Sequence, residues 1–240
     1  MKKNNPTIIL VRPQLSENIG MTARAMDNFG LSKLSIVNPR DGWPSKKAYD
    51  SSKHGKHIIK NAKIFNSLER AISNHNLVIA TSNRKRFLTK KTYDNFYFLN
   101  KKINQSKKVA IVFGPENSGL TNQDLRLANF IFTIPTANKN RSLNLSHAVI
   151  VISYEFYNSN LTNLNKIEDL KKNTVSKSKL SNFMNILIKD LDYKGFFNPI
   201  EKKQSMIDNI YAIYNKIELT EKELRMLWGM HKKLKKLPKK

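Results

Sequence analysis

The sequence predicts an α/β fold, with a mostly parallel sheet covered by helices on both faces and an all-helical segment after it. Three observations lead to this prediction. Short apolar runs alternate with helical patterns as far as Tyr157, as they do in parallel sheets that carry helices on both faces. A polar stretch rich in Asn, Lys, Ser and Thr follows. Beyond that stretch, the spacing of the apolar residues is helical only.

Five segments are predicted to be buried strands. Each is a few residues long and consists almost entirely of apolar or β-branched residues, which is the pattern of a strand inside a sheet. Helical patterns lie between several of them. The five strands, in chain order, are Thr7–Val11, Leu34–Val37, Leu77–Thr81, Val109–Phe113 and Phe130–Ile134.

Three helices are predicted between or after these strands. The first spans Asn18–Phe29, has its apolar residues on one face and ends at Gly30, a residue type that favours a helix stop. A short second helix follows Thr121 and Asp124, whose spacing is that of a capping box. The third spans Leu145–Tyr157 and is apolar almost throughout, so we expect it to be buried.

The change of composition near residue 158 predicts three regions: a core domain over 1–158, a polar linker over 159–179 and a helical extension over 180–240. Thr220 and Glu223 form a capping-box pattern in the extension. This extension either packs against the core domain or supports RNA binding or dimer formation. Its predicted helices are Leu180–Leu191, Pro199–Ile217 and Thr220–Leu237.

The composition favours a polyanionic partner. The chain has 240 residues, with 43 Lys and Arg against 18 Asp and Glu, which gives a net charge of +25. Coding bias accounts for part of the lysine content, but acidic residues are scarce as well, and clustered lysines attract nucleic acid. Because no apolar run approaches the roughly 20 residues that span a bilayer and no signal peptide is recognisable, we expect a cytoplasmic protein without a membrane partner.

Several common kinds of site are excluded by the sequence. The chain has no cysteine, which rules out disulfides, thiolate metal sites and cysteine nucleophiles. It contains neither a G-x-G-x-x-G nor a G-x-x-x-x-G-K-[ST] pattern, so the usual dinucleotide and P-loop sites are absent. His54 and His57 are spaced for one helix face, but no cluster of carboxylates lies near them in the sequence. We therefore predict no metal site.

Three motifs carry the functional information. The first reads E-N-I-G-M-T-A-R-A-M and spans Glu17–Met26; the second reads F-G-P-E-N-S-G-L and spans Phe113–Leu120. The third begins with I-P at Ile134 and continues as R-S-L-N-L-S over Arg141–Ser146. Taken singly, these segments are ordinary loops and helix caps. Asn18, for example, is a residue type that suits the N-cap of a helix.

In this order and spacing, the three motifs resemble those of the SpoU/TrmH branch of the SPOUT methyltransferases. That family transfers a methyl group from S-adenosylmethionine to a ribose 2'-hydroxyl in RNA. The resemblance implies that residues 1–158 form a methyltransferase domain with a C-terminal trefoil knot, that S-adenosylmethionine is the cofactor and that the protein is a homodimer. Arg24 of one subunit would then face the cofactor held by the other.

The resemblance also implies the roles of individual residues. Arg24 corresponds to the family's essential arginine; since a guanidinium stays protonated at neutral pH, we expect it to stabilise the developing alkoxide or to hold the adjacent phosphate. Asn18 would orient Arg24 or the substrate, and Glu116 would hold the third motif's loop. The predicted catalytic residues are Arg24, Asn18, Glu116, Ser142 and Asn144.

The resemblance implies cofactor contacts at the ends of three strands, and for the second motif this agrees with the place where open α/β sheets bind their ligands. The predicted cofactor-binding residues are Thr81, Ser82, Asn83, Gly114, Glu116, Gly119, Ile134, Arg141, Ser142, Leu143 and Leu145. Basic residues beside the same region are expected to contact RNA phosphates. They are Arg12, Arg84, Lys85 and Arg86.

The helical extension indicates which group within this family the sequence resembles most. A core domain followed by a polar linker, by the segment Gly195–Pro199 and by a capped helix at Thr220 is similar to the TrmJ group, which methylates the pyrimidine ribose at position 32 of tRNA. The substrate is therefore predicted to be tRNA, with another tRNA position or ribosomal RNA as the near alternative. A non-catalytic RNA-binding protein on the same fold is the alternative from a different class, although the intact motifs speak against it.

Overall fold

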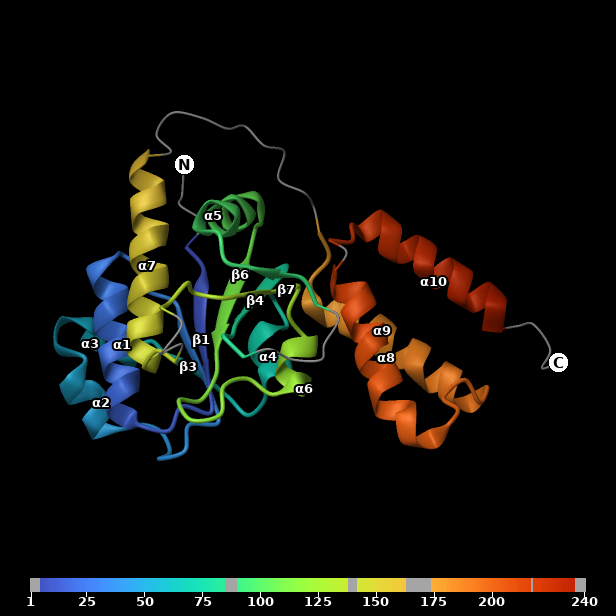
Figure 1. Ribbon diagram of the computed structural model, residues 1–240, viewed down its shortest axis with the longest axis horizontal. Coiled ribbons are helices and arrows are strands. Elements are labelled where there is room, and N and C mark those ends of the chain that lie inside the picture. The colour runs from blue at the N-terminus through green and yellow to red at the C-terminus, as the bar shows by residue number, and fades with distance from the viewer. Residues whose placement is uncertain (1–4, 85–89, 138–141, 163–173, 217, 236–240) are drawn as a thin grey trace.

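The computed structural model describes residues 5–84, 90–137, 142–162, 174–216 and 218–235 (Figure 1). A seven-stranded parallel sheet forms its centre, with strand order β3-β2-β1-β6-β4-β7-β5. The strands are β1 (Thr7–Val11), β2 (Leu34–Val37), β3 (Lys63–Phe65), β4 (Leu77–Thr81), β5 (Thr92–Tyr93), β6 (Val109–Phe113) and β7 (Phe130–Phe132). Because β6, β4 and β7 are neighbours and parallel, the loops that follow them meet at one edge of the sheet.

Successive residues of β1 point to opposite faces of the sheet, as the two-residue period of a strand requires. Ile8 and Leu10 belong to one apolar core, whereas Ile9 and Val11 belong to the other. The first face is covered by α1 (Ser16–Asn28), α2 (Lys46–Ser51), η1 (Lys53–Gly55), α3 (Lys56–Lys60), α5 (Phe96–Gln105) and α7 (Leu145–Thr162). In Figure 1, α7 lies directly beside α1 on this side.

The opposite face carries two short helices and the C-terminal helices. These are α4 (Leu68–Ile72), α6 (Asn122–Arg126), α8 (Lys177–Tyr193), η3 (Ile200–Lys202), α9 (Lys203–Lys216) and α10 (Glu221–Lys235). Leu180, Phe183 and Leu224 from the C-terminal helices are buried in the same apolar core as Ile9 and Val11. The C-terminal helices thus share a core with the sheet (Figure 1).

Gly20 of the first motif allows α2 to approach α1 closely. A Cβ atom at this position would lie 2.0 Å from the Ser51 Oγ and 2.2 Å from the Ala48 carbonyl oxygen. Any larger residue would therefore push the two helices apart. This glycine is required by packing, independently of any role in binding.

The predicted α/β architecture is confirmed, and so are all five predicted strands, although the last ends at Phe132 rather than Ile134. Both predicted capping boxes form: the Thr121 side chain and the Asp124 carboxylate bond each other's backbone N–H groups, as do Thr220 and Glu223. The sequence patterns missed the short elements β3, β5, α2, α3 and α4, and also α5.

The segment predicted as a linker is partly helical. Helix α7 continues to Thr162, beyond the predicted end at Tyr157, and α8 begins at Lys177 rather than Leu180. Val175 is buried, and its backbone N–H donates to the Leu219 carbonyl at 2.8 Å. Residues 163–173 lie outside the described part of the chain. The division into three regions remains a prediction, with the polar segment shorter than expected.

Candidate active site

A cavity of about 230 Å³ opens at the carboxyl edge of the sheet, where β4, β6 and β7 end. Its walls come from the loops after these three strands and from the start of α7. The lining residues are Thr81, Ser82, Asn83, Arg84, Phe113, Gly114, Pro115, Glu116, Gly119, Ile134, Ser142, Leu143, Leu145 and Ala148. Segments far apart in the sequence therefore form one site because the sheet places β4 between β6 and β7.

Every predicted cofactor residue that the structure describes lines this cavity, and only Arg141 lies outside the described residues. The sequence did not single out Phe113, Pro115 and Ala148, which also line it. Each of them lies within or just beyond a motif that was recognised. Two signals in the sequence could have identified them. Phe113 and Pro115 belong to the second motif, and Ala148 lies in the helix that continues the third motif.

The cavity combines apolar walls with a few oriented polar groups. Phe113, Leu145 and Ala148 supply apolar surface, while Glu116 and the residues after β4 supply polar atoms. The Thr81 hydroxyl donates to the Val112 carbonyl at 2.9 Å, which ties the end of β4 to β6. Such a mixture fits a ligand that has a flat apolar part and several hydrogen-bonding groups.

Gly114 is required by the geometry of the second-motif loop. A Cβ atom here would lie 2.4 Å from the Leu120 backbone nitrogen and 2.5 Å from the Gly119 carbonyl carbon. Gly119 itself has a φ of +66°, a conformation that L side chains rarely adopt. The two glycines thus let the loop fold back tightly on itself beside the cavity.

Three predicted catalytic residues form one hydrogen-bonded chain. The Asn144 side-chain amide donates to Asn18 Oδ1 at 3.1 Å, and the Asn18 amide donates to Glu116 Oε1 at 2.7 Å. One residue from each of the three motifs takes part. The chain therefore links the first helix, the second-motif loop and the start of α7 into a single polar unit.

Glu116 and Asn144 also satisfy backbone groups at helix starts. The Glu116 carboxylate accepts from the backbone N–H of Gln14 at 2.9 Å and of Leu15 at 3.4 Å, just ahead of α1. The Asn144 side chain accepts from the Ser146 N–H at 2.9 Å at the start of α7. A carboxylate is favourable at this end of a helix. Helix capping and the polar network are hence two functions of the same side chains.

The remaining two predicted catalytic residues lie apart from this chain. Ser142 lines the cavity and is exposed. Arg24 is exposed on α1, does not line the cavity and makes no hydrogen bond or ion pair with any residue that the structure describes. A single chain thus assembles the cavity and the polar network but leaves the predicted catalytic arginine outside them.

Comparisons with known proteins identify the family to which this chain belongs. A sequence model described as the SpoU rRNA Methylase family matches residues 5–154. The chain belongs to the SpoU rRNA methylase family. It is 33% identical over 241 residues to the tRNA (cytidine/uridine-2'-O-)-methyltransferase TrmJ of Photorhabdus laumondii subsp. laumondii, which covers 98% of this chain and 99% of that protein. It is 36% identical over 174 residues to the tRNA (cytidine-2'-O-)-methyltransferase TrmJ of Methanocaldococcus jannaschii, over 71% and 74% of the two chains.

Solved structures of methyltransferases also resemble this protein. The crystal structure of TrmJ from Z. mobilis ZM4 superposes with a TM-score of 0.87 at 35% identity, over 96% of this chain and 99% of that one. The SpoU methyltransferase AviRb from Streptomyces viridochromogenes, solved in complex with the cofactor AdoMet, superposes with a TM-score of 0.54 at 21% identity, over 68% and 63%. The first likeness spans the C-terminal helices as well as the SpoU methylase fold, whereas the second concerns the fold alone.

In this member of the SpoU methylase family, the predicted RNA-binding residues differ in their surroundings. Arg84 lines the cavity and donates to the Asn117 carbonyl at 2.7 Å. Arg12 pairs with the buried Asp124, which gives it a structural role beside any contact with RNA. Lys85 and Arg86 lie outside the described residues.

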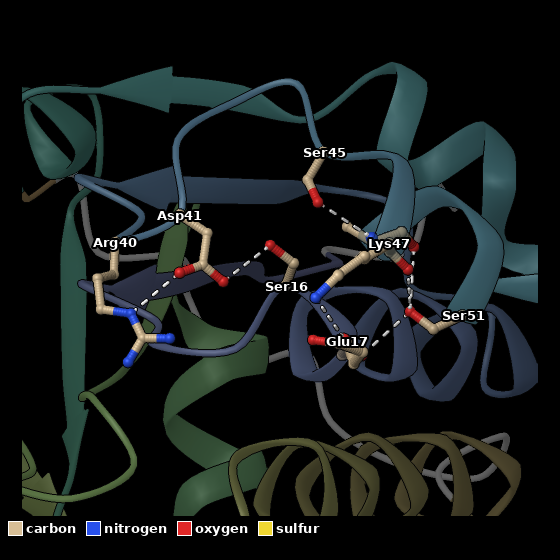
Figure 2. Close-up of polar contacts among 8 residues, drawn as sticks. Ser16, Glu17, Arg40, Asp41, Ser45, Lys47 and Ser51 are labelled. Atoms are coloured by element: carbon tan, nitrogen blue, oxygen red, sulfur yellow. Dashed lines mark hydrogen bonds and ion pairs between the residues drawn. The ribbon is translucent and has the colours of Figure 1, made fainter.

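The start of α1, where the first motif begins, is held by the loop before α2 and by α2 itself. The Ser16 hydroxyl donates to Asp41 Oδ2 at 3.4 Å, and Glu17 pairs with Lys47 at 3.5 Å (Figure 2). The Asp41 carboxylate also accepts from Arg40 at 3.0 Å, and this hydrogen bond lowers its pKa. These contacts fix the beginning of α1, from which Asn18 reaches Glu116.

The described residues contain neither a metal-ligand cluster nor a membrane-spanning helix. Among them, no group of three or more His, Cys, Asp or Glu side chains is arranged to hold a metal ion. His57 instead lies 3.6 Å from the Asp27 carboxylate, and His54 is exposed. No helix in the described part of the chain is long and apolar enough to cross a membrane.

Proposed function

We propose that the protein transfers a methyl group from S-adenosylmethionine to a ribose 2'-hydroxyl in tRNA, and that its target is the pyrimidine at anticodon-loop position 32. The hydrogen-bonded chain of Asn144, Asn18 and Glu116 beside the cavity carries this proposal, because it joins all three family motifs. The full-length match to relatives named as tRNA (cytidine/uridine-2'-O-)-methyltransferases supports the substrate class.

The cavity fits S-adenosylmethionine by the chemistry of its walls. Leu143, Leu145 and Ile134 offer apolar surface to an adenine ring, while Thr81 and Ser82 offer hydroxyl and backbone groups to polar atoms. The Glu116 carboxylate gives the cavity a negative group that suits a cationic ligand. When bound, the cofactor supplies an electrophilic methyl group on a positively charged sulfur.

The protein's own residues act on the ribose. Methyl transfer would form a bond from the ribose 2'-oxygen to the methyl carbon, break the bond from that carbon to the cofactor sulfur so that S-adenosylhomocysteine leaves, and release the hydroxyl proton to solvent. The 2'-oxygen must therefore become more nucleophilic. Arg24 is free to stabilise the negative charge that develops on this oxygen, because it has no partner among the described residues. Asn18 and Asn144 hold the motif loops in register around the reacting groups.

A homodimer would bring Arg24 to the cavity of a second subunit. Large apolar side chains are exposed on the adjoining helices α1 and α7, namely Met21, Ile150, Tyr154 and Tyr157. Exposed apolar patches of this kind mark interaction surfaces. Arg24 lies one helical turn from Met21, so an interface formed by this patch includes the catalytic arginine.

We also propose that the segment from β6 to α7 forms the family's trefoil knot. Strand β7 follows β6 in sequence, yet β4 lies between them in the sheet. Residues at the ends of β4 and β7 and at the start of α7 all line the same cavity. This order of strands supports a threaded path and accounts for the convergence of three loops on one site.

The charge of the protein supports an RNA substrate. A net charge of +25 favours association with phosphates, and the C-terminal helices contribute the basic residues Lys232, Lys233 and Lys235 at the end of α10. A tRNA substrate places the proposed activity in the cytoplasm. Arg84, a basic residue in the cavity wall, would guide the anticodon loop to the cavity.

The test is transfer of a labelled methyl group from S-adenosylmethionine to unmodified tRNA transcripts, followed by mapping of the modified nucleotide by mass spectrometry. We expect one 2'-O-methyl group, at position 32. A methyl group at another position would retain the enzyme class and discard the target. Cofactor binding without transfer to tRNA or ribosomal RNA would overturn the proposed activity.

A further inference from the structure

Helix α6 lies between the active-site loops and the C-terminal helices. It has only five residues, Asn122–Arg126, and follows directly on the second-motif loop. Isolated helices shorter than about 12 residues are marginal in water, so α6 depends on what it packs against. Two of its charged residues, Asp124 and Arg126, point to different parts of the protein and define its two sets of contacts.

Asp124 holds the active-site side. Its carboxylate is buried and pairs with the Arg12 guanidinium through both oxygens, one of them at 3.2 Å from Nη1. It also accepts from the Thr121 backbone N–H and hydroxyl, each at 2.8 Å. Arg12 precedes the first motif and Thr121 follows the second. Asp124 therefore ties both motif loops to α6.

Arg126 holds the opposite side. Its Nη1 lies 3.1 Å from Asp208 Oδ1 of α9, and its guanidinium carbon lies 4.6 Å from the centroid of the Tyr211 ring. The Arg126 backbone carbonyl accepts from the Asn215 side chain at 2.9 Å and from Lys90 Nζ at 3.0 Å. Only 20% of the Arg126 side chain and 17% of the Asp208 side chain are exposed.

We propose that Arg126 is a positioning residue for the active site, through which α9 sets the placement of the two motif loops. The C-terminal helices then form part of the catalytic unit in addition to any contact with RNA. The links are as follows. Asp208 of α9 contacts Arg126, and Arg126 and Asp124 belong to the same short helix, α6. Asp124 in turn contacts Arg12 and Thr121. The inference rests on the proposed function, because it assumes that the cavity beside these loops holds S-adenosylmethionine.

The test compares Asp208→Ala with Asp192→Ala. Asp192 also lies in the C-terminal helices and pairs with a lysine, Lys203, at 2.7 Å, but this pair does not touch α6. The readouts are the dissociation constant of S-adenosylhomocysteine by calorimetry at 25 °C, the kcat and KM of methyl transfer, and the thermal unfolding temperature. We expect Asp208→Ala to raise the dissociation constant of S-adenosylhomocysteine roughly two- to thirtyfold, which is the range of coupling through contact networks. Asp192→Ala should leave this dissociation constant unchanged.

A conservative replacement and a double mutant distinguish an effect on the position of the active-site loops from an effect on the stability of the whole protein. Asp208→Glu keeps a carboxylate within reach of Arg126 and should recover most of the affinity. Arg126→Met should weaken cofactor binding as Asp208→Ala does, and combining the two should add little to the loss of affinity, because both remove the same Arg126–Asp208 ion pair. A lower unfolding temperature with unchanged cofactor affinity and unchanged kcat in Asp208→Ala would overturn the inference. If the wild-type protein itself bound no cofactor, the proposed function would fail instead.

Discussion

At the scale of single residues, the candidate active site is built from side chains that each serve two purposes. Glu116 accepts from backbone groups ahead of α1 and from Asn18, and Asn144 caps α7 while it donates to Asn18. Contacts within the protein hold these residues in place. Arg24 differs because it is exposed and unpaired among the described residues, as expected of a group that acts on a ligand or across an interface.

Replacing Arg24 therefore tests its role in the methyl-transfer step without disturbing the fold. We expect Arg24→Ala to keep the fold and the cofactor affinity and to lower kcat by about a hundredfold or more, as loss of a charge-stabilising donor does. Arg24→Lys should recover only part of the rate, since an ammonium lacks the planar fork of a guanidinium. Single-turnover methyl transfer and calorimetry measure the two quantities. Unchanged turnover in Arg24→Ala would remove this residue from the mechanism.

The buried Lys90 leads to a second prediction at this scale, which concerns how the stability of the folded protein depends on pH. Its ammonium group is buried against the carbonyls of Arg126 and Ala128, and burial, with a smaller effect of Lys216, lowers its pKa from 10.5 to about 7. Between these values the unfolded chain binds more protons than the folded one, so the stability of the folded state rises with pH over this window. Below pH 7 the full cost of burying the charge remains.

Urea unfolding between pH 7 and 10 measures this effect, with Lys90→Met as the comparison because it keeps the volume of the side chain without its charge. We expect the wild-type free energy of unfolding to rise more steeply with pH than that of the variant. Lys177 is buried beside the same cluster, and its pKa is lowered by burial and by the charge of Lys90, so the difference between the two curves reports the coupled pair of lysines. Parallel curves would contradict the assignment of a neutral Lys90 above pH 7.

At the scale of elements, what the sequence revealed depended on length and burial. Strands such as β1 and β6 are continuous apolar runs, and α7 is a long apolar helix, so their patterns were readable. Strand β3 has two exposed residues of three, and β5 has only two residues. Helices α2, α3 and α4 are five or six residues long, too short for a periodic pattern to emerge.

The glycines of two helices give a matched prediction at this scale. Gly20→Ala should destabilise the protein by about 1–3 kcal/mol, because its methyl group would overlap Ser51 and the Ala48 carbonyl. Gly229→Ala on α10 meets nothing within 4 Å and should stabilise the protein by about 0.5–1 kcal/mol through helix propensity. Urea denaturation of both variants measures the difference. Equal effects would show that α1 and α2 do not approach as closely as described.

At the scale of the whole molecule, the site was more predictable from the sequence than the way the domain and extension combine. The motifs identified most of the cavity wall because their residues are close to one another in the chain. The shared core of Ile9, Phe183 and Leu224, and the burial of Lys90 and Lys177, depend on contacts between distant segments. No local pattern in the sequence carries that information.

The net charge of +25 makes a prediction for the molecule as a whole. The dissociation constant for tRNA should rise about tenfold or more between 50 and 200 mM salt, because several lysines and arginines release counterions when they bind phosphates. The affinity for S-adenosylhomocysteine should change little over the same range. Filter binding and calorimetry on the same preparation give both profiles. A flat tRNA profile would argue against a phosphate-driven interface.

The most direct measurement uses two forms of one tRNA transcript that differ only at position 32, with ribose in one and 2'-deoxyribose in the other. Labelled S-adenosylmethionine and the wild-type protein are supplied to both. The account predicts that the ribose form accepts one methyl group and that the deoxy form accepts none. Equal labelling of the two forms, or no labelling of either, would contradict it.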